Sequence, residues 1–297
     1  ARARGELDGV MPVTVQITLR QDTLIHFTVE VENRVRSHRL CVHFATDILA
    51  HISCADQQFG AVTRPVQLSD ALRVWEDEGW HEKPVAIEPM QSYVNLHDDS
   101  HGFTLHTNGV REYEIVGDRF DTIAVTLFRS FGYMGKTNLL YRPGRASGET
   151  VVATPDAQLM GTLRFNFSWR IYQGRFDDAR HAQISKALLT AFPVYQDSDF
   201  LNGRLRFCLS DEKRTYPLEH SVLALPDGPQ DAQLSVVKCA ENGNGLVCRF
   251  YNPNLAASVA IPALENAHCV LLDEQTPAPE RRMLKPNDVQ TLYIEIA

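Results

Sequence analysis

Alternation of apolar and polar residues is the sequence feature that most constrains the fold of this chain. It begins in residues 13–19 and recurs in residues 25–32, 40–44 and 123–127. A side-chain period of two is that of an extended strand with one apolar and one polar face. Such strands pair into antiparallel sheets that pack the apolar face on a core and leave the polar face in water. In the first strand we therefore expect four side chains to be buried: Val13, Val15, Ile17 and Leu19.

The longest alternating segment predicts a large sheet. Apolar residues occupy every second position from Leu163 to Ile171, with polar residues between them. Only residues 177–192 combine a composition rich in Ala, Leu and Lys with helical spacing, which predicts one short helix near 178–191 that Pro193 ends. Because helices and strands do not alternate along the chain, a doubly wound fold is disfavoured. The predicted fold class is all-β, with a large antiparallel β-sandwich as the main domain.

A polar stretch at residues 193–203 predicts a domain boundary. The 297 residues exceed what one typical core needs. Beyond the stretch, short strand patterns are separated by turn clusters at 226–229 and 242–245. We expect the large sandwich in residues 1–200 and a smaller C-terminal β domain in residues 204–297. The strands expected in the second domain are 205–209, 233–238, 246–251, 257–261, 269–272 and 290–296.

The composition limits the classes of partner. The net charge of −8, from 37 acidic and 29 basic residues, argues against a nucleic-acid-binding surface, which carries a clustered basic excess. Apolar runs are only a few residues long, so no membrane-spanning segment is expected, and the N-terminal residues lack the apolar stretch of a signal peptide. The six cysteines form no Cys-x-x-Cys pair and are interpreted as reduced thiols, which predicts a cytoplasmic protein. Homo-oligomer formation is left open.

Three groups of residues could carry chemistry, but each has a plainer interpretation. Cys41 and His43 share a strand face and could begin a zinc site, which would need further ligands that the sequence does not identify. The acidic clusters Glu76–Glu78 and Asp98-Asp99 have the residue type that glycosidases use. We interpret both clusters as solvated loop residues, because a general acid needs burial that raises its pKa. No catalytic residue and no metal ligand is therefore assigned.

Arg129 is the candidate binding residue. It continues the apolar phase of Ile123, Val125 and Leu127, so its side chain starts on the face expected to be buried. An unpaired guanidinium is costly there. Either a bulge rotates the side chain outward, or it emerges at the end of the sandwich near Gly132. A structural ion pair is the commoner way to satisfy such a charge, and contact with a ligand is the alternative.

Short motifs connect these features to a known family. The segments are Phe59-Gly60 with Arg64-Pro65, Gly109–Glu114, Ile123–Gly132, Thr154–Gln158 with Gly161, Lys238–Glu241 with Arg249–Asn252, and Thr291-Leu292. Together and in this order they resemble the C-terminal part of glycoside hydrolase family 38, the α-mannosidase family, over nearly the whole chain. Gly109–Glu114 and Ile123–Gly132 resemble its paired strands Gly-Leu-x-Glu-Tyr-Glu and Leu-Thr-Leu-x-Arg-Ser-x-Gly. Trp75–Trp80 and Leu140–Gly144 are similar to the bacterial branch that includes mannosylglycerate hydrolases.

The resemblance implies a galactose mutarotase-like supersandwich followed by a smaller C-terminal β-sandwich. It also implies a retaining α-mannosidase whose aspartate nucleophile and divalent metal, usually zinc, lie in an N-terminal α/β domain outside this chain. The implied partners are that catalytic domain and a mannoside, and no cofactor is expected in this portion. His97-Asp98-Asp99 matches the letters of the family's metal motif but lies in a turn, so no metal is assigned to it. In some members an arginine of the sandwich closes the sugar pocket, and Arg129 is the position that matches it.

One function is preferred and two rivals stay open. The preferred function is the C-terminal portion of an α-mannosidase-type glycoside hydrolase, inactive alone, which braces the catalytic domain and supplies Arg129 to the mannoside. The first rival is a stand-alone carbohydrate-binding or interaction module. The second is a sugar epimerase, which would need a histidine and a carboxylate on one concave face. A reading frame that extends several hundred codons upstream would distinguish the preferred function from the first rival.

Overall fold

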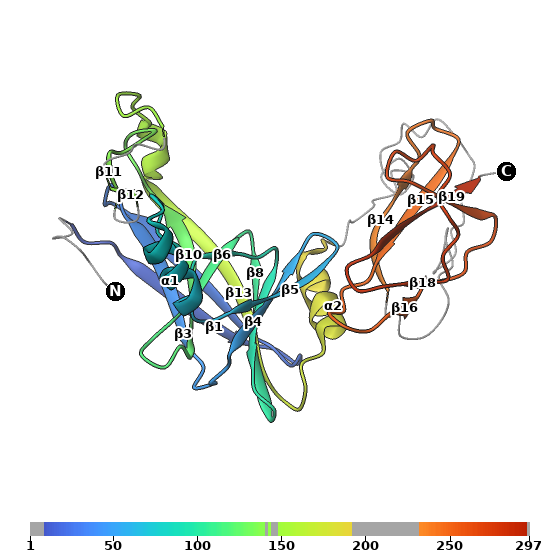
Figure 1. Ribbon diagram of the computed structural model, residues 1–297, viewed down its shortest axis with the longest axis horizontal. Helices are drawn as coiled ribbons and strands as arrows, with labels where there is room; N and C mark the ends of the chain where they lie inside the picture. Colours follow the sequence, from blue (N-terminus) through green and yellow to red (C-terminus); the bar gives the residue numbers. More distant parts are fainter. Residues whose placement is uncertain (1–8, 140–141, 144–147, 192–231, 296–297) are drawn as a thin grey trace, which may run out of the picture.

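The fold consists of two β lobes of unequal size. The computed structural model describes residues 9–139, 142–143, 148–191 and 232–295. The described residues up to 191 form the larger lobe and residues 232–295 the smaller one. Helix α2 (Asp178–Leu189), at the end of the larger lobe, lies between the two sandwiches (Figure 1). The predicted boundary at 193–203 and the strand expected at 205–209 lie outside the described residues. Within these residues no helix is long and apolar enough to cross a membrane.

The described part of the larger lobe contains thirteen strands, two α-helices and a short 3-10 helix at Pro155–Gln158. Helix α1 spans Ser69–Glu78. The strands are β1 (Val13–Leu19), β2 (Ile25–Asn33), β3 (Arg39–Ala45), β4 (Ile52–Gln57), β5 (Gly60–Pro65), β6 (Glu88–Pro89), β7 (Tyr93–His97), β8 (His101–Asn108), β9 (Glu112–Val116), β10 (Thr122–Arg129), β11 (Asn138–Leu139), β12 (Arg142–Pro143) and β13 (Gly161–Gln173).

Two antiparallel sheets face each other in the larger lobe. A seven-stranded sheet runs in the order β1-β2-β13-β8-β7-β4-β5, and a four-stranded sheet in the order β3-β10-β9-β6. Their apolar faces form one core, whose most buried members include Val31, Val94, Leu96, Leu105, Ile123 and Val125. The predicted all-β sandwich is therefore confirmed. The long segment expected from Leu163 to Ile171 is the central strand β13, which pairs with both β2 and β8.

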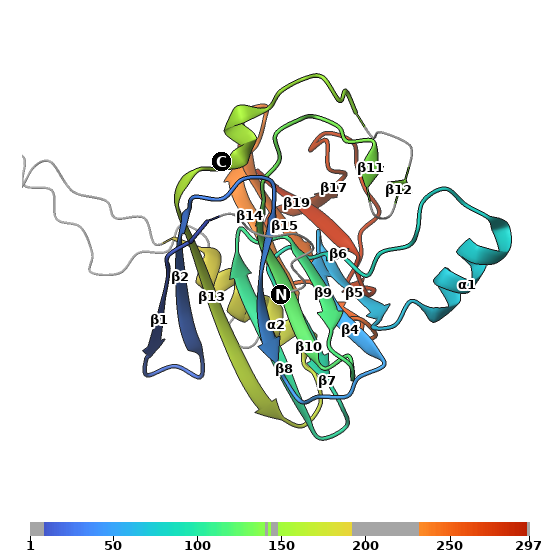
Figure 2. The ribbon, with the colours of Figure 1, turned by 90° about the vertical axis from the view of Figure 1, so that its left-hand side faces the viewer.

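The prediction for the first strand is wrong in one respect. β1 pairs with β2 in register, as the alternation indicates, and Val29 and Val31 of β2 are buried. The apolar residues of β1 are exposed, however, by 52% at Val13 and up to 75% at Leu19. β1 is the outermost strand of the wider sheet, and in Figure 2 the β1–β2 hairpin stands at its edge, away from β9 and β10. The four-stranded sheet does not reach far enough to cover it.

One helix is as predicted and one was not predicted. α2 begins after Asp177, whose carboxylate accepts a hydrogen bond from the backbone N–H of Arg180, a standard N-cap. It packs on the outer face of the seven-stranded sheet, on the side opposite the core. α1 includes part of Trp75–Trp80, which the sequence indicated as a loop, and ends at Gly79 with a left-handed φ of 63°. No residue of α1 is buried.

The smaller lobe also has two sheets around one core. A four-stranded sheet runs β14-β15-β19-β17 and a two-stranded sheet pairs β16 with β18. Cys248, Phe250 and Leu292 of the first sheet pack with Val259 and Leu284 of the second. All these strands except β18 were predicted. Their bounds are β14 (Gln233–Cys239), β15 (Gly245–Tyr251), β16 (Val259–Ala260), β17 (Ala267–Val270), β18 (Met283–Leu284) and β19 (Val289–Glu295).

The lobes contact each other through β5 and the start of α2. The backbone N–H of Ala61 donates to Oδ1 of Asn287 at 2.8 Å, and the Phe59 and Tyr251 rings lie 6.1 Å apart. A Cβ on Gly60 would lie 1.8 Å from Asn287 Oδ1, so only glycine admits this approach. The Phe59-Gly60 motif thus serves the contact between the lobes.

Candidate functional site

A β-bulge decides where Arg129 points. β10 pairs with β3 in regular register up to Thr126–Cys41, and the register then shifts so that Phe128 faces Leu40 and Arg129 faces Arg39. Leu127 and Phe128 are therefore both buried. The extra residue moves Arg129 from the apolar phase to the outer face of the four-stranded sheet. Of the two possibilities for this residue, the bulge is the one that occurs.

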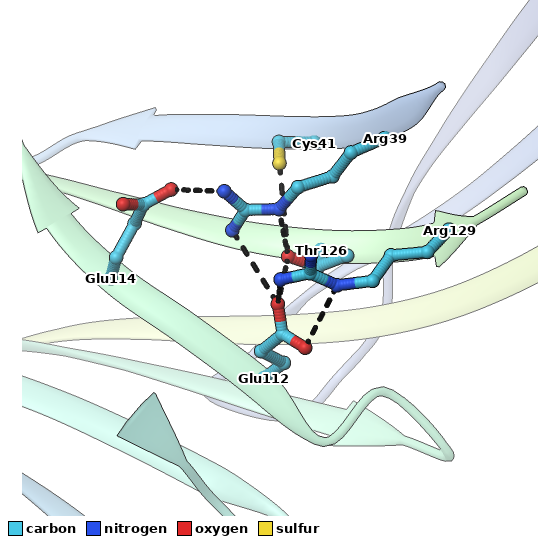
Figure 3. Close-up of polar contacts among 6 residues, drawn as sticks. All are labelled: Arg39, Cys41, Glu112, Glu114, Thr126 and Arg129. Atoms are coloured by element: carbon cyan, nitrogen blue, oxygen red, sulfur yellow. Dashed lines mark hydrogen bonds and ion pairs between the residues drawn. The ribbon is translucent and has the colours of Figure 1, made fainter. Parts of the chain in front are cut away.

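On the outer face, Arg129 belongs to a cluster of six side chains, which we call the outer-face cluster: Arg39, Cys41, Glu112, Glu114, Thr126 and Arg129 (Figure 3). Arg129 Nε donates to Glu112 Oε2 at 3.3 Å, and its Nη2 is also paired with Glu112. Arg39 donates from Nη1 to Glu114 at 2.7 Å and from Nε to the Thr126 hydroxyl at 2.8 Å. The Thr126 hydroxyl in turn donates to Glu112 Oε1 at 3.0 Å.

The electrostatics of the outer-face cluster favour the ionised form of Glu112. Partial burial alone would raise the pKa of this carboxyl, but hydrogen bonds from Arg129 and Thr126 and the charge of Arg39 outweigh it, so the pKa lies below its ordinary value. Burial raises the pKa of the Cys41 thiol, which lies 3.8 Å from the Thr126 hydroxyl. Glu112 is therefore an anchor for arginine side chains and not a general acid, and Cys41 is not an activated nucleophile.

The arrangement suits binding of a polar ligand. The Arg129 side chain is 46% exposed, whereas that of Arg39 is 26% exposed. A guanidinium has five N–H donors, and Glu112 engages only part of those of Arg129. A bidentate partner also fixes the plane of the group, so the remaining donors have a defined direction. Arg129 can thus present fixed donors to hydroxyl or carboxylate oxygens above the sheet.

The structure supports the plain interpretation of the acidic clusters. Asp98 Oδ1 accepts from the backbone N–H groups of Ser100 and His101, at 2.7 and 2.9 Å, in the turn between β7 and β8. These hydrogen bonds lower its pKa to about 2, the opposite of what a general acid requires. Glu76, Asp77 and Glu78 lie on the exposed surface of α1, where Asp77 pairs with Arg73 at 3.2 Å.

The candidate metal ligands do not converge. Cys41 and His43 share the outer face of β3, as the alternation indicates, but His43 is exposed and Cys41 contacts Thr126. His97 bonds to Asn95 Oδ1 at 2.7 Å and stacks on Phe176 at 5.3 Å. Among the residues that the structure describes, no group of three or more His, Cys, Asp or Glu could hold a metal ion. The zinc that the family resemblance implies therefore has no ligand set in this part of the chain.

Several residues around Arg129 were missed from the sequence. Arg39, Glu112 and Glu114 were not assigned a role, although Glu112 and Glu114 flank the buried Tyr113 in strict alternation and so share one face. That alternation was the available signal. It could not show that β3 brings Arg39 beside them, because sheet order is a property of the fold.

A polar cleft lies on the outer face of the seven-stranded sheet. It has a volume of about 260 Å³ and is lined by residues of β2, β8, β13 and α2. Within it His26 bonds to Ser168 Oγ at 2.8 Å and to Asp22 at 2.9 Å. This pairing occupies both ring nitrogens of His26, which are then not free for a ligand.

Other motif residues serve the fold. Gln158 accepts from the backbone N–H of Ser37 at 2.7 Å, and Asn252 donates to the carbonyls of Ala257 and Leu284. Lys238 pairs with Glu274 at 2.9 Å and also with Glu241. Apart from Arg129, these motif side chains satisfy buried or turn positions and do not converge on one site.

Comparisons with known proteins agree with this architecture. The sequence profile described as the glycosyl hydrolases family 38 C-terminal domain matches residues 7–157. A "Putative mannosylglycerate hydrolase" of Halalkalibacterium halodurans is 25% identical over 267 residues, which are 90% of this chain and 25% of that protein. This chain therefore spans about a quarter of the length of the curated relative.

Two solved structures share the fold. An α-mannosidase from Enterococcus faecalis V583 superposes with a TM-score of 0.68 at 24% identity and covers 95% of this chain and 29% of that one. A glycosyl hydrolase family 38 protein from Enterococcus faecalis gives a TM-score of 0.66 at 23% identity, covering 95% and 30%. This chain belongs to glycosyl hydrolase family 38 and contains its C-terminal domain.

Proposed function

We propose that this chain is the C-terminal portion of an α-mannosidase-type glycoside hydrolase and that it braces a catalytic domain outside the chain. Arg129 would complete the sugar site by donating hydrogen bonds to the mannoside. The domain division at about 200, the retaining mechanism and the cytoplasmic location belong to the same proposal. Mannosylglycerate is the substrate suggested by the relative from Halalkalibacterium halodurans.

The position of Arg129 is the observation that carries the proposal. It lies at the end of β10 on an outer sheet face, half-exposed and oriented by Glu112. A charge held in this way has already lost part of its conformational entropy, so contact with a substrate costs less. The described cysteines, which are unpaired, support a reducing location.

The chemistry of glycosidic cleavage would lie outside the described residues. A retaining glycosidase needs a nucleophilic carboxylate and an acid with a raised pKa about 5 Å apart. Asp98 has a lowered pKa and the α1 carboxylates are exposed, so neither supplies the acid. Zinc, when bound in the catalytic domain, would polarise sugar oxygens. The role of this chain would be to orient the substrate and to exclude water from the sugar site.

The test uses the full-length chain, encoded by the reading frame extended upstream. Replacing Arg129 by Ala should lower kcat/KM for an aryl α-mannoside about tenfold or more, because one charged contact in the transition state is lost. The matched control is Arg34→Ala, since Arg34 is also half-exposed and paired with a glutamate, Glu32, at 2.7 Å. An equal kcat/KM in the two variants would refute the role of Arg129. A reading frame that does not extend upstream would favour the stand-alone module.

A second test concerns the 297-residue chain alone. It should not hydrolyse an aryl α-mannoside, with or without added zinc. Turnover that survives purification and disappears in Asp98→Asn or Asp99→Asn would contradict the two-part enzyme.

A further inference from the structure

The apolar face of the larger sandwich continues beyond its core. Val13, Val15, Ile17 and Leu19 of β1 lie on the same sheet face as the buried Val29 and Val31 of β2, because paired residues of neighbouring strands point to the same side. These four residues are 52–75% exposed, and Ile171 at the end of β13 is 62% exposed. We call these five residues the apolar margin.

A groove connects the apolar margin to the edge of the other sheet. It has a volume of about 430 Å³, and its lining includes Val15, Phe27, Val42, Phe44, Trp169 and Ile171. Its walls are the seven-stranded sheet near β1 and the outermost strand β3 of the four-stranded sheet. The sandwich is therefore open on this side and exposes a continuous apolar surface, which a soluble protein normally covers.

Among the described strands, both that border the groove have a free edge. Within this part of the chain β1 pairs only with β2, and β3 pairs only with β10. β1 has the sequence Val-Thr-Val-Gln-Ile-Thr-Leu, without a charged residue or a proline. Natural edge strands usually carry such residues or are covered by another element, because an apolar edge promotes aggregation. β1 has the features of a strand that is covered in the functional protein.

We propose that the apolar margin and its groove are the docking surface for the region that precedes this chain in the full-length enzyme. This inference rests on the proposed function and specifies the surface through which the bracing would occur. The occupant would present an apolar segment that fills the groove between β1 and β3.

Two observations favour this occupant over a second copy of the chain. About three quarters of the curated relative lies outside the matched region, and so does about 70% of the α-mannosidase from Enterococcus faecalis. A body of that size has the surface needed to cover the margin. In addition, β3 forms one wall of the groove and carries Arg39 of the outer-face cluster. Arg39 points to the opposite face of β3, so a domain that fills the groove and continues round the free edge of β3 would reach the face that carries Arg129.

Hydroxyl-radical footprinting of the 297-residue chain and of the full-length chain tests this surface. In the 297-residue chain Ile17 and Leu19 should be oxidised readily. In the full-length chain their oxidation should fall about fivefold or more, because interface cores exclude water. Rates are normalised to Leu271 and Leu272, which are 49% and 56% exposed in the smaller lobe.

The variants separate docking from folding. In the full-length chain, Val15→Lys combined with Ile17→Lys should restore oxidation of Leu19 to the rate of the 297-residue chain. Gln16→Lys, on the opposite face of the same strand, should leave Leu19 protected. In the 297-residue chain neither variant should shift the thermal midpoint by more than about 2 °C, because the replaced side chains are exposed.

Three outcomes would overturn the docking proposal. Leu19 could be equally reactive in both chains, it could stay protected in the double lysine variant, or it could already be protected in the 297-residue chain. In the last case, sedimentation at several concentrations would distinguish a second copy from a segment of the same chain. A fall in kcat/KM with Arg129→Ala but no protection of Leu19 would refute the docking surface and leave the proposed function intact.

Discussion

The two sheets of the larger sandwich carry polar clusters of opposite character on their outer faces. The outer-face cluster of the four-stranded sheet is charged and partly open to water, with Arg129 paired to Glu112. The cluster beneath α2, on the seven-stranded sheet, is uncharged and buried. Its members are Asn95, Thr104, His106, His181 and Ser185, each at most 3% exposed.

The buried cluster is organised by its hydrogen bonds. His106 bonds to Ser185 at 2.7 Å and lies 3.4 Å from His181, and the two rings are stacked. Burial lowers the pKa of His106 to about 3 and that of His181 to about 4. Both rings are therefore neutral at pH 7.

This difference in solvent exposure predicts that the buried cluster stabilises the fold and that the half-exposed cluster is available to bind a ligand. A buried, fully paired network fixes α2 on the sheet, and breaking it leaves polar atoms that water cannot reach. A half-exposed ion pair contributes little to stability, because water solvates the separated charges well. For the same reason its arginine can exchange part of its contacts for a ligand. We expect mutations beneath α2 to alter stability and mutations at Arg129 to alter activity.

The largest expected effect is at His106. Replacing it by Ala removes a buried ring and leaves Ser185 without its partner, which should lower the free energy of unfolding by about 3–4 kcal/mol. Urea unfolding of the 297-residue chain measures this. The control is His43→Ala, whose side chain is exposed on β3, and a change under about 0.5 kcal/mol is expected for it. If both variants lost a similar free energy of unfolding, the buried cluster would have no special role in stability.

The buried histidines should also make stability depend on pH. Their folded pKa values lie below the ordinary value near 6.5, so between about pH 4 and 6.5 the unfolded chain binds more protons. The free energy of unfolding should therefore fall as the pH falls, by about 3 kcal/mol from pH 7 to pH 5 for the two together. Urea titrations at several pH values test it.

The control for the pH effect removes the two titrating groups. A His106→Asn and His181→Asn double variant should lose this slope, whereas replacing exposed His43 and His51 should not change it. An unchanged slope in the first variant would assign the acid sensitivity to carboxylates elsewhere.

A smaller effect is expected at Glu112. Replacing it by Gln weakens its contacts with Arg129, Arg39 and Thr126, but Arg39 keeps Glu114. The loss should be about 1 kcal/mol, and it should shrink when salt is raised to about 1 M. Urea curves at low and high salt measure it, with Glu32→Gln as the control because Glu32 pairs with exposed Arg34. A salt-independent loss of several kcal/mol would mean that the outer-face cluster is also structural.

The smallest expected effect on stability is at Arg129. Replacing it by Ala in the 297-residue chain should change the free energy of unfolding by less than about 0.5 kcal/mol, because the side chain is 46% exposed and, among the described residues, pairs with Glu112 alone. A loss above about 1 kcal/mol would indicate that the ion pair with Glu112 is the main role of this residue. In that case only the kcat/KM of the Arg129→Ala variant could show whether Arg129 also binds the mannoside.

Much of the fold could be predicted from the sequence, and the misses have physical causes. The alternation located most strands, and Asp177 and Pro193 bracket the predicted helix α2. α1 was missed because its acidic residues were interpreted as part of a solvated loop. The helix is amphipathic, but none of its side chains is buried. The motif around Arg129 identified the residue, but its partner Glu112 depended on pairing between β9 and β10.

The sequence by itself determined the all-β class, the alternating faces and the family motifs, because a period of two is a local property of the chain. Only the tertiary structure decided which apolar faces are covered and where Arg129 points. The apolar pattern of β1 is as regular as that of β2, yet the opposing sheet covers only β2. A single bulge between Thr126 and Phe128 reverses the face of every later residue of β10. Both outcomes depend on how the strands pair and on how wide each sheet is. Residue periodicity predicts neither the pairing nor the width.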